Sequence, residues 1–405
     1  MTEFRKEYIK RPVYLEKIRP YIDKDIIKVI IGQRRVGKSY MLYQIMDEII
    51  TRHNHPQIIY VNKELDDFEK IRTYSDLLEY VKSKETGSGK KYLFIDEIQE
   101  IESFEKALRS LQAKGDYDIY CTGSNAKLLS GELASYLSGR YVEIKLYSLS
   151  FSEFIDFHKL SNSQESLFKY FKFGGLPYLI NLKLEEHIVY DYLKNIYAAI
   201  LFKDVVKRYN VRNINFLENL VSYLADNTGS LVSSKKISDF LKSQKIKISP
   251  QLVLDYLSHL ESAFFIFKAV RADIAGKKIF EIGEKYYFED LGLRHSIVGY
   301  KANDINKIME NAVYQHLKIS GYIIHVGKSG DKEIDFICER SGKKIYVQVA
   351  YLLQDEKTIN REFGNLMEIK DNYPKYVVSM DEAISGSDFN GIEHLQIRDF
   401  ISKLR

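Results

Sequence analysis

Short apolar runs alternate with helical stripes over the first 150 residues of the chain. The apolar runs read as buried strands, and the segments between them carry apolar residues three and four positions apart, as amphipathic helices do. The predicted strands are 26–31, 57–62, 92–95, 117–121 and 141–144, and the predicted helices are 7–22, 40–46, 73–81 and 104–111. Strands that alternate with helices indicate a parallel sheet with helices on both faces, so we expect an α/β fold here.

The pattern changes after about residue 213. Three amphipathic helices are predicted first, and two apolar runs that can pair as a hairpin follow them, which is the order of elements in a winged helix. From residue 301 onward, the predicted order is helix, three strands, helix and strand. The three helical stripes are 216–224, 237–241 and 253–260, the hairpin runs are 264–267 and 285–288, and the last six elements begin near 305, 322, 333, 344, 357 and 376.

Composition favours a globular protein. The 405 residues are 45% apolar and 29% charged, which is enough for two to three domains with hydrophobic cores. The net charge of +4 is too small to indicate a nucleic-acid partner, so any basic surface must be local. The two cysteines, Cys121 and Cys338, lie far apart and indicate no disulfide scaffold. Neither an apolar signal region nor a run long enough to cross a bilayer is present, so we expect a cytoplasmic protein.

A phosphate-binding motif follows the first predicted strand. The sequence Gly-Gln-Arg-Arg-Val-Gly-Lys-Ser at 32–39 fits G-x-x-x-x-G-K-[ST], and it lies between a strand and a helix, as this motif requires. Its glycines let backbone N–H groups turn toward phosphates at the amino end of a helix. Lys38 would then reach the β- and γ-phosphates, and Ser39 would bind Mg²⁺. The expected nucleotide-binding residues are Gly32, Gln33, Arg34, Arg35, Val36, Gly37, Lys38, Ser39 and Tyr40.

Two carboxylates end the predicted strand at 92–95. A carboxylate at the end of a buried strand can hold Mg²⁺ through a water, and a second one beside it can polarise the attacking water. We assign Asp96 to the metal and Glu97 to the water. Acids also end strands as solvated residues, but a spacing of about 60 residues from the phosphate loop favours the catalytic interpretation.

The next strand ends in the polar sequence Thr122-Gly123-Ser124-Asn125. The side chain of Thr122, Ser124 or Asn125 could sense the γ-phosphate, and the sequence leaves open which of the three does so, although such a sequence also forms ordinary turns. We include Asn125 among the expected nucleotide-binding residues. Further along, Arg140 could neutralise charge in the transition state, in the same chain or from a neighbouring subunit. A solvated surface arginine is the equally open alternative for this residue.

Together these motifs resemble the AAA+-like P-loop ATPases, and specifically the prokaryotic ATPase family related to the STAND class. The resemblance spans nearly the whole chain, and its most telling segments are 32–39, 94–99, 122–125, 137–140 and 149–154. It implies that the loop binds ATP with Mg²⁺ and that a helical lid follows the sheet. It also implies that the Gly-Gly-Leu-Pro turn at 174–177 approaches the nucleotide, which makes Pro177 a candidate contact of the base.

Basic residues gather in the expected winged-helix segment, at 235, 236, 242, 245, 247, 271, 277 and 278. They could contact the phosphates of duplex DNA, although the third helix offers a poor set of base-reading side chains. In AAA+-like and STAND proteins, the winged helix often packs on the ATPase core instead. DNA contact and internal packing are therefore equal alternatives.

The last hundred residues resemble the PD-(D/E)xK nuclease fold. Glu310 and Asp335 would match its helix glutamate and its metal-binding aspartate, but its next motif, an acid, any residue and a lysine, falls on Gln348-Val349-Ala350. The metal thereby loses a carboxylate ligand, and no lysine stabilises the attacking hydroxide. Because glutamine can still ligate weakly, we treat Glu310, Asp335 and Gln348 as a vestigial site and expect no nuclease activity.

The sequence thus predicts four parts: a P-loop ATPase core at 1–155, a helical lid at 156–212, a winged-helix-like domain at 213–300 and a nuclease-like α/β domain at 301–405. The leading hypothesis is an ATPase with Lys38, Glu97 and Arg140 as catalytic residues, which couples hydrolysis to motion of the lid and winged helix. The alternative is a DNA-binding or scaffolding switch that binds ATP and hydrolyses little of it, and a less favoured one is an ATP-dependent nuclease that uses Glu310 and Asp335. Whether the partner is DNA or a protein, and whether the chain forms oligomers, is left open.

Overall fold

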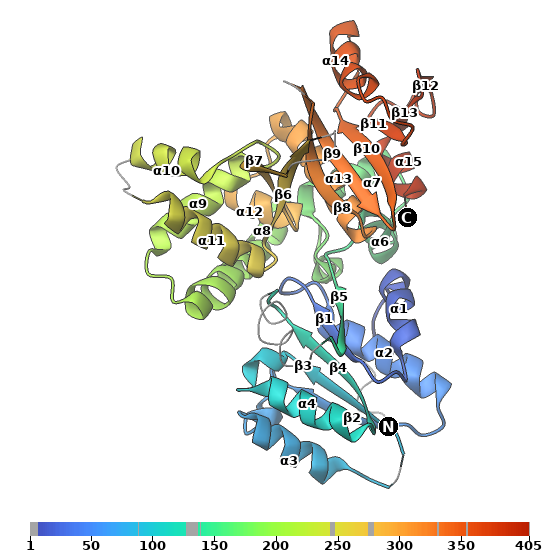
Figure 1. The fold of residues 1–405 in the computed structure, drawn as a ribbon, viewed down its shortest axis with the longest axis vertical. Coiled ribbons are helices and arrows are strands. Elements are labelled where there is room, and N and C mark those ends of the chain that lie inside the picture. The colour runs from blue at the N-terminus through green and yellow to red at the C-terminus, as the bar shows by residue number, and fades with distance from the viewer. Residues whose placement is uncertain are drawn as a thin grey trace. The chain divides into compact units, whose positions relative to one another are not determined.

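The chain folds into two compact units. The computed structural model describes residues 7–87, 89–126, 137, 139–243, 248–273, 279–329, 332–353 and 355–404. The first unit comprises Met1–Tyr147 with the short segment Ser262–Phe264, and the second comprises Ser148–Glu261 with Phe265–Arg405. Figure 1 labels the elements of both units. The four-part division predicted from the sequence stays a prediction, and its boundaries after residues 155, 212 and 300 all fall inside the second unit.

The first unit is built on a five-stranded sheet in the order β2-β3-β4-β1-β5, and every neighbouring pair is parallel. Every residue of β1, β3 and β4 is buried, as expected for central strands covered on both faces. The strands are β1 (Ile27–Ile31), β2 (Gln57–Asn62), β3 (Lys91–Asp96), β4 (Tyr117–Gly123) and β5 (Tyr141–Lys145), and the helices are α1 (Pro12–Ile18), α2 (Lys38–Arg52), α3 (Tyr74–Lys84) and α4 (Phe104–Lys114). The α/β prediction for this region is confirmed.

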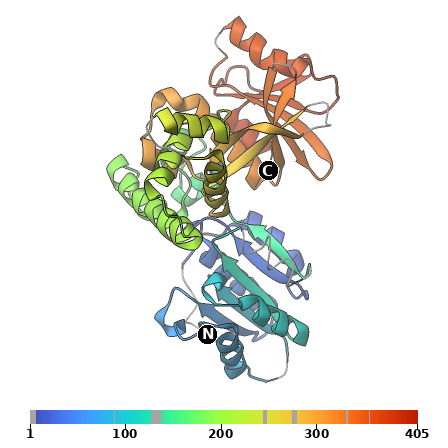
Figure 2. The same ribbon diagram turned by 60° about the vertical axis from the view of Figure 1, so that its left-hand side comes forward.

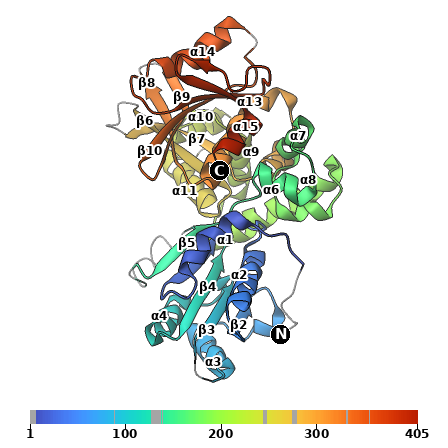
Figure 3. The ribbon, with the colours of Figure 1, turned by 90° about the vertical axis from the view of Figure 1, so that its right-hand side faces the viewer.

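Crossover handedness explains how the helices of the first unit cover the sheet. The chain leaves β1, crosses to β2 at the sheet edge through α2, and then returns through β3 and β4 by way of α3 and α4. Because crossovers between parallel strands are right-handed, α2 lies on one face and α3 and α4 lie on the other. Figure 3 shows α2 and α4 on opposite sides of the strands. Because the strands are parallel, the carboxyl ends of β1, β3 and β4 lie together at the same end of the sheet.

The second unit begins with helices. They are α6 (Phe151–His158), α7 (Gln164–Phe173), α8 (Glu186–Ala199), a π-helix (Ile200–Lys207), α9 (Ile214–Asp226), α10 (Ser234–Ser243), α11 (Pro250–Ser262) and α12 (Leu291–Val298). The lid segment is helical, as the resemblance implied. The two glycines before Pro177 are required by close packing, because a Cβ on Gly174 would lie 2.3 Å from Asp290 Oδ1 and one on Gly175 would lie 2.4 Å from Leu149 O.

A mixed eight-stranded sheet forms the rest of the second unit, in the order β12-β13-β11-β10-β9-β8-β6-β7. Its strands are β6 (Ile266–Asp273), β7 (Ile279–Phe288), β8 (Ile323–Ser329), β9 (Lys332–Arg340), β10 (Lys343–Val349), β11 (Lys375–Ser379), β12 (Asp388–Phe389) and β13 (Ile392–Gln396), and its helices are α13 (Ile305–Ile319), α14 (Glu356–Met367) and α15 (Ile397–Lys403). The predicted order of helix, three strands, helix and strand is confirmed, with β12, β13 and α15 added at the end.

The hairpin differs from its prediction. β6 and β7 pair as expected, but β6 also pairs in parallel with β8, so the hairpin extends the C-terminal sheet and does not form the wing of a separate domain. Figure 2 shows the hairpin beside the strands of the C-terminal sheet. The sequence could not reveal this pairing, because it joins strands about 50 residues apart with helices α12 and α13 between them.

Strand alternation gives the mixed sheet two hydrophobic faces. On β10, Ile345 and Val347 belong to the core under α13, whereas Tyr346 between them belongs to the core under α14. Helices thus cover both faces of this sheet, as Figure 3 shows. Among the described residues, no helix combines the length and the apolar character needed to span a bilayer.

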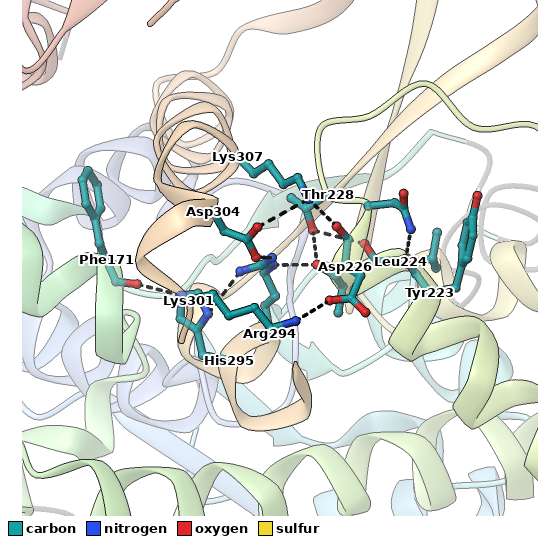
Figure 4. Close-up of polar contacts among 12 residues, drawn as sticks. Phe171, Tyr223, Leu224, Asp226, Thr228, Arg294, His295, Lys301, Asp304 and Lys307 are labelled. Atoms are coloured by element: carbon teal, nitrogen blue, oxygen red, sulfur yellow. Dashed lines mark hydrogen bonds and ion pairs between the residues drawn. The ribbon is translucent and has the colours of Figure 1, made fainter. Parts of the chain in front are cut away.

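A fully buried arginine joins the helices of the second unit to one another (Figure 4). Arg294 on α12 donates from Nε to Ala225 O at 2.7 Å and from Nη2 to Asp304 Oδ2 at 2.7 Å. The Nε2 atom of its neighbour His295 lies 3.0 Å from Phe171 O. Burial, and then the charge of Arg294, lowers the pKa of His295 to about 3, so the imidazole is neutral and can accept a hydrogen bond from Arg294. One cluster therefore connects α7, α9, α12 and the start of α13.

Removal of this arginine should destabilise the second unit. Arg294→Ala leaves the Asp304 carboxylate and the Ala225 carbonyl without their donor, so we expect a loss of about 3–5 kcal/mol in the free energy of unfolding. Urea unfolding followed by circular dichroism measures this loss. The exposed Arg212 offers a control, and Arg212→Ala should change stability by less than about 0.5 kcal/mol. Equal effects of the two substitutions would contradict the role given to Arg294.

Candidate nucleotide site

The loop between β1 and α2 has the backbone shape of a phosphate-binding loop. A Cβ on Gly32 would lie 2.1 Å from Leu146 O, so only glycine fits there. Gly37 has φ +97°, in the left-handed region that glycine adopts without strain, and α2 begins at the next residue. The glycines of the motif are therefore explained by this geometry, and the loop leads directly into the amino end of a helix.

A buried arginine that the sequence did not reveal holds the loop in place. Arg11, just before α1, is 3% exposed and donates from Nη1 to Val36 O at 3.1 Å and to Tyr147 O at 2.9 Å. Its backbone N–H donates to Gln44 Oε1 on α2 at 2.9 Å. Arg11 thus connects the phosphate loop, the following helix and the segment after β5, which makes it a positioning residue for the loop.

Lys38 lies in the loop that it is expected to serve. Its Nζ donates to Gly32 O and Gln33 O, both at 3.2 Å, and lies 3.6 Å from Glu97 Oε1. The lysine is 5% exposed, so its charge acts in a region of low dielectric, where it attracts anionic oxygens more strongly than it would in water. The structure therefore brings together Lys38 and Glu97, the residues predicted to bind phosphate and to act as the base.

Asp96 ends β3 as a fully buried carboxylate. Thr122 Oγ1, on the neighbouring strand β4, donates to Asp96 Oδ1, and Ser39 also hydrogen-bonds to this carboxylate. Burial raises the pKa of Asp96, while the bonds from Ser39 and Thr122 act in the opposite direction. A hydroxyl and a carboxylate side by side are the oxygen ligands that Mg²⁺ takes from proteins when phosphates supply the others. Ser39 and Asp96 therefore fit the expected metal site.

Glu97 has an unusual backbone. Its φ of +57° and ψ of +54° lie in the left-handed region, which costs roughly 1 kcal/mol or more for a residue that is not glycine. Its N–H donates to Thr122 Oγ1 at 2.9 Å, and this bond helps to hold the conformation. The strained backbone directs the Glu97 carboxylate toward Lys38, away from the direction that a continued strand would give it.

The other loop residues lie at different depths. Gln33 is fully buried and donates from Nε2 to Phe264 O at 3.1 Å. Arg34 Nη1 lies 3.9 Å from Glu64 Oε1. Arg35 is exposed and has a φ of +71°, and the Tyr40 side chain on α2 is 45% exposed. Contacts of these side chains with a nucleotide remain predictions.

The polar turn after β4 lies at the same edge of the sheet. Thr122 contacts Asp96, Ser124 Oγ lies 3.4 Å from Gln99 Nε2, and Asn125 is 3% exposed. The structure thus places Thr122 against the acidic pair and Ser124 beside Gln99, which hydrogen-bonds to Glu97. Sensing of the γ-phosphate by one of these three residues, and contact of Asn125 with the nucleotide, stay predictions.

Arg140 lies at the amino ends of the strands, whereas the loop lies at their carboxyl ends. It directly precedes β5, whose first residue Tyr141 pairs with Ile27 at the amino end of β1, whereas the loop follows Ile31 at the other end. Five residues of strand separate these ends by roughly 16 Å. The placement argues against action of the exposed Arg140 on the nucleotide of its own chain, and action from a neighbouring subunit stays a prediction. Pro177 belongs to the second unit, so its contact with the base is likewise a prediction.

The second unit contains a separate acidic site, and a lysine fills it. Lys285 on β7 donates from Nζ to Glu310 Oε1 at 2.8 Å and to Asp335 Oδ1 at 3.2 Å, and lies 2.9 Å from Glu333 Oε1. The motif position itself holds Ala350 and supplies no lysine, as the sequence shows. Lys285 comes from β7, outside the nuclease-like segment, and provides a cation beside these carboxylates that the motif did not predict.

Gln348 is already engaged by its neighbours. Its Oε1 accepts from Asp335 N at 3.2 Å, and its Nε2 donates to Glu362 Oε2 at 2.8 Å. A cavity of about 610 Å³ beside it is lined by Glu310, Asp335, Gln348 and Glu362 among others. Across the described ranges, no group of three His, Cys, Asp or Glu side chains is arranged to hold a metal ion. The side chains are thus organised around Lys285.

The basic residues of the expected winged helix are only partly described. Lys235 and Lys236 are exposed on α10, and Lys242 Nζ lies 3.5 Å from Asp239 Oδ1 on the same helix. Residues 245, 247, 277 and 278 lie outside the described residues. DNA contact through this segment stays a prediction.

Three comparisons place the chain among known proteins. Residues 24–155 match the AAA domain family, and residues 164–304 match a domain of unknown function. An uncharacterized protein of Haemophilus influenzae is 36% identical over 405 residues, which cover 98% of this chain and 99% of that protein. An uncharacterized protein of Methanocaldococcus jannaschii is 32% identical over 389 residues, or 91% and 86% of the two chains.

A solved structure shares the fold. The Walker-type ATPase of Pyrococcus abyssi superposes with a TM-score of 0.51 at 16% identity, and the match covers 73% of this chain and 97% of that one. At this identity the likeness concerns the fold alone. The family match over residues 24–155 and the shared fold thus agree on an AAA-type P-loop domain, and the relatives leave the activity of the whole chain undefined.

Loss of the buried lysine should make stability depend more strongly on pH. Burial raises the pKa of Glu310 to about 7 even though Lys285 acts in the opposite direction. In Lys285→Met this lowering is lost while the Asp335 carboxylate stays close by, so the folded-state pKa of Glu310 rises further above its unfolded value. The folded state then binds more protons than the unfolded state between about pH 4 and 8, and stability falls as pH rises through this window. We expect a loss of about 3 kcal/mol at pH 8 and a smaller loss at pH 5.

Thermal unfolding at both pH values checks this prediction. Lys268→Met is the control, because Lys268 is 37% exposed in its pair with Glu284 on the same hairpin, and its removal should have little effect at either pH. Equal destabilisation of Lys285→Met at pH 5 and pH 8 would contradict the account.

Proposed function

Because the chain belongs to one family with these uncharacterized relatives from H. influenzae and M. jannaschii, and because its residues 24–155 match the AAA domain family, we propose that it hydrolyses Mg²⁺·ATP at the loop Gly32–Ser39. The observation that carries this proposal is the meeting of Lys38, Asp96 and Glu97 at one edge of the parallel sheet. These residues supply a cation for the phosphates, a ligand for the metal and a base for water, which are the groups that phosphoryl transfer to water requires.

Each side chain has a task in the reaction ATP + H₂O → ADP + phosphate. Backbone N–H groups of the loop and Lys38 Nζ bind phosphate oxygens, while Ser39 and Asp96 would hold Mg²⁺, which neutralises phosphate charge when bound. Glu97 orients the water and takes its proton as the oxygen attacks the γ-phosphorus. The bond from that phosphorus to the β–γ bridging oxygen breaks, and its electron pair leaves with ADP. Thr122 positions both residues, because its hydroxyl donates to the Asp96 carboxylate and accepts from the backbone N–H of Glu97.

A short segment far along the chain could report the state of the nucleotide. Ser262–Phe264 belongs to the first unit, although the residues on either side of it belong to the second. Phe264 O accepts from Gln33 in the phosphate loop at 3.1 Å, and Ser262 O accepts from Ala126 N after the polar turn at 2.9 Å. A change in either turn would act directly on the connection between α11 and β6. This supports coupling of hydrolysis to motion of the helices and hairpin between residues 213 and 300.

The partner that responds to this motion is DNA or a protein, and a basic α10 with exposed Lys235 and Lys236 favours a test with DNA first. Hydrolysis of DNA is not part of the proposal, because Lys285 occupies the space among the carboxylates of the nuclease-like segment. The competing function is a switch that binds ATP, contacts DNA or a scaffold and turns over little nucleotide.

Steady-state phosphate release tests the proposal. We expect Glu97→Gln to lower kcat at least about 100-fold, because it removes the group that accepts the water's proton, while ATP still binds. The matched control is Glu102→Gln, which changes an exposed glutamate five residues away and should leave kcat unchanged. Equal turnover by wild type and Glu97→Gln would contradict hydrolysis at this site. Stimulation by duplex DNA would identify the partner class, and no stimulation would point to a protein.

A further inference from the structure

Gln99 holds the side chain of Glu97. It lies in the 3₁₀ turn Ile98–Glu100 that follows β3, and its Nε2 donates to Glu97 Oε2. The same nitrogen lies 3.4 Å from Ser124 Oγ in the polar turn. Gln99 Oε1 is shielded from solvent and has no hydrogen-bond partner among the described residues. We propose that Gln99 positions Glu97 for ATP hydrolysis and that its free carbonyl oxygen accepts a hydrogen bond from the attacking water.

The orientation of the amide follows from its neighbour. An ionised carboxylate only accepts hydrogen bonds, so the atom of Gln99 that faces Glu97 must be the NH₂ nitrogen. The oxygen is therefore the atom without a partner. A buried acceptor that stays unpaired costs about 1–3 kcal/mol, so its occurrence beside a proposed catalytic base calls for a donor. The water that Glu97 activates carries two protons, one for the base and one for this oxygen.

Local structure explains why residue 99 reaches residue 97. The left-handed conformation of Glu97 ends β3 and reverses the chain, and Glu100 N donates to Glu97 O at 3.1 Å to close the turn. Ile98 and Ile101 are each 1% exposed, and their burial anchors the turn on the core of the unit. With the backbone fixed in this way, the Gln99 side chain folds back onto the Glu97 carboxylate.

Gln99 also connects the base to the polar turn after β4. The backbone of Glu97 is bound by Thr122, and its side chain is linked through Gln99 to Ser124, two residues further along. A shift of this turn in response to the γ-phosphate would therefore move both the backbone and the carboxylate of Glu97. Gln99 is in this respect a positioning residue, because it acts through Glu97. The inference rests on the proposed ATP hydrolysis and adds to it a second water-orienting group.

Two substitutions test the two parts of this role. Gln99→Ala removes both the donor and the acceptor, and we expect kcat to fall about 100-fold while KM and the affinity for Mg²⁺·ATP change less than about twofold. Gln99→Glu keeps the shape but places a second carboxylate beside Glu97. The donor to Glu97 is then lost and the two carboxylates repel each other, so kcat should fall at least as far as in Gln99→Ala, while KM again changes less than about twofold.

A matched control and separate readouts make the result decisive. Gln57→Ala changes a glutamine of the same unit that donates to Lys84 O, and it should leave kcat unchanged. Full kcat in Gln99→Ala, with turnover lost in Glu97→Gln, would overturn the inference and leave ATP hydrolysis intact. Equal losses of kcat, nucleotide affinity and melting temperature in Gln99→Ala would also overturn it, because they would show a structural role alone. Absence of hydrolysis in the wild type would overturn both proposals.

Discussion

The parallel pairing of β1, β3 and β4 is the constraint on which the nucleotide site depends. Its register sets Ile31 beside Gly123 and Ile95 beside Cys121, so the three strands end at the same edge. Everything that follows these strands is brought together there, which includes the phosphate loop, the acidic pair and the polar turn. Parallel strands need crossover helices, and the same crossovers bury both faces of the sheet. One pattern of backbone hydrogen bonds thus builds the core and assembles the site.

The site itself departs from low-energy local structure, and the surrounding contacts offset that cost. Asp96 is a buried carboxylate, and Glu97 adopts a left-handed backbone; each carries a cost on the order of 1–3 kcal/mol. Thr122 contacts both residues, Gln99 holds the carboxylate of Glu97, and Arg11 fixes the loop from the side of α1. Strain that persists only because neighbouring groups fix it is typical of sites arranged for chemistry.

The sequence was most informative where function depends on neighbouring residues. The loop at 32–39 and the pair Asp96-Glu97 could be recognised because their spacing is local, and the five parallel strands followed from alternating periodicity. Arg11 could not be found, because a buried arginine before a helix has no sequence pattern of its own. Lys285 and the joining of the hairpin to β8 depend on pairings between distant segments. The placement of Arg140 depended on strand register, which periodicity does not fix.

The measurement that tests the central claim most directly is calorimetric titration of Mg²⁺·ATP into the wild type and into Lys38→Ala. The account predicts saturable binding of one nucleotide per chain in the wild type and a loss of affinity of at least about 100-fold in the variant, because a buried charge-assisted contact to phosphate is removed. Unchanged binding in Lys38→Ala, or no binding by the folded wild type, would contradict the assignment of the loop Gly32–Ser39 as the nucleotide site.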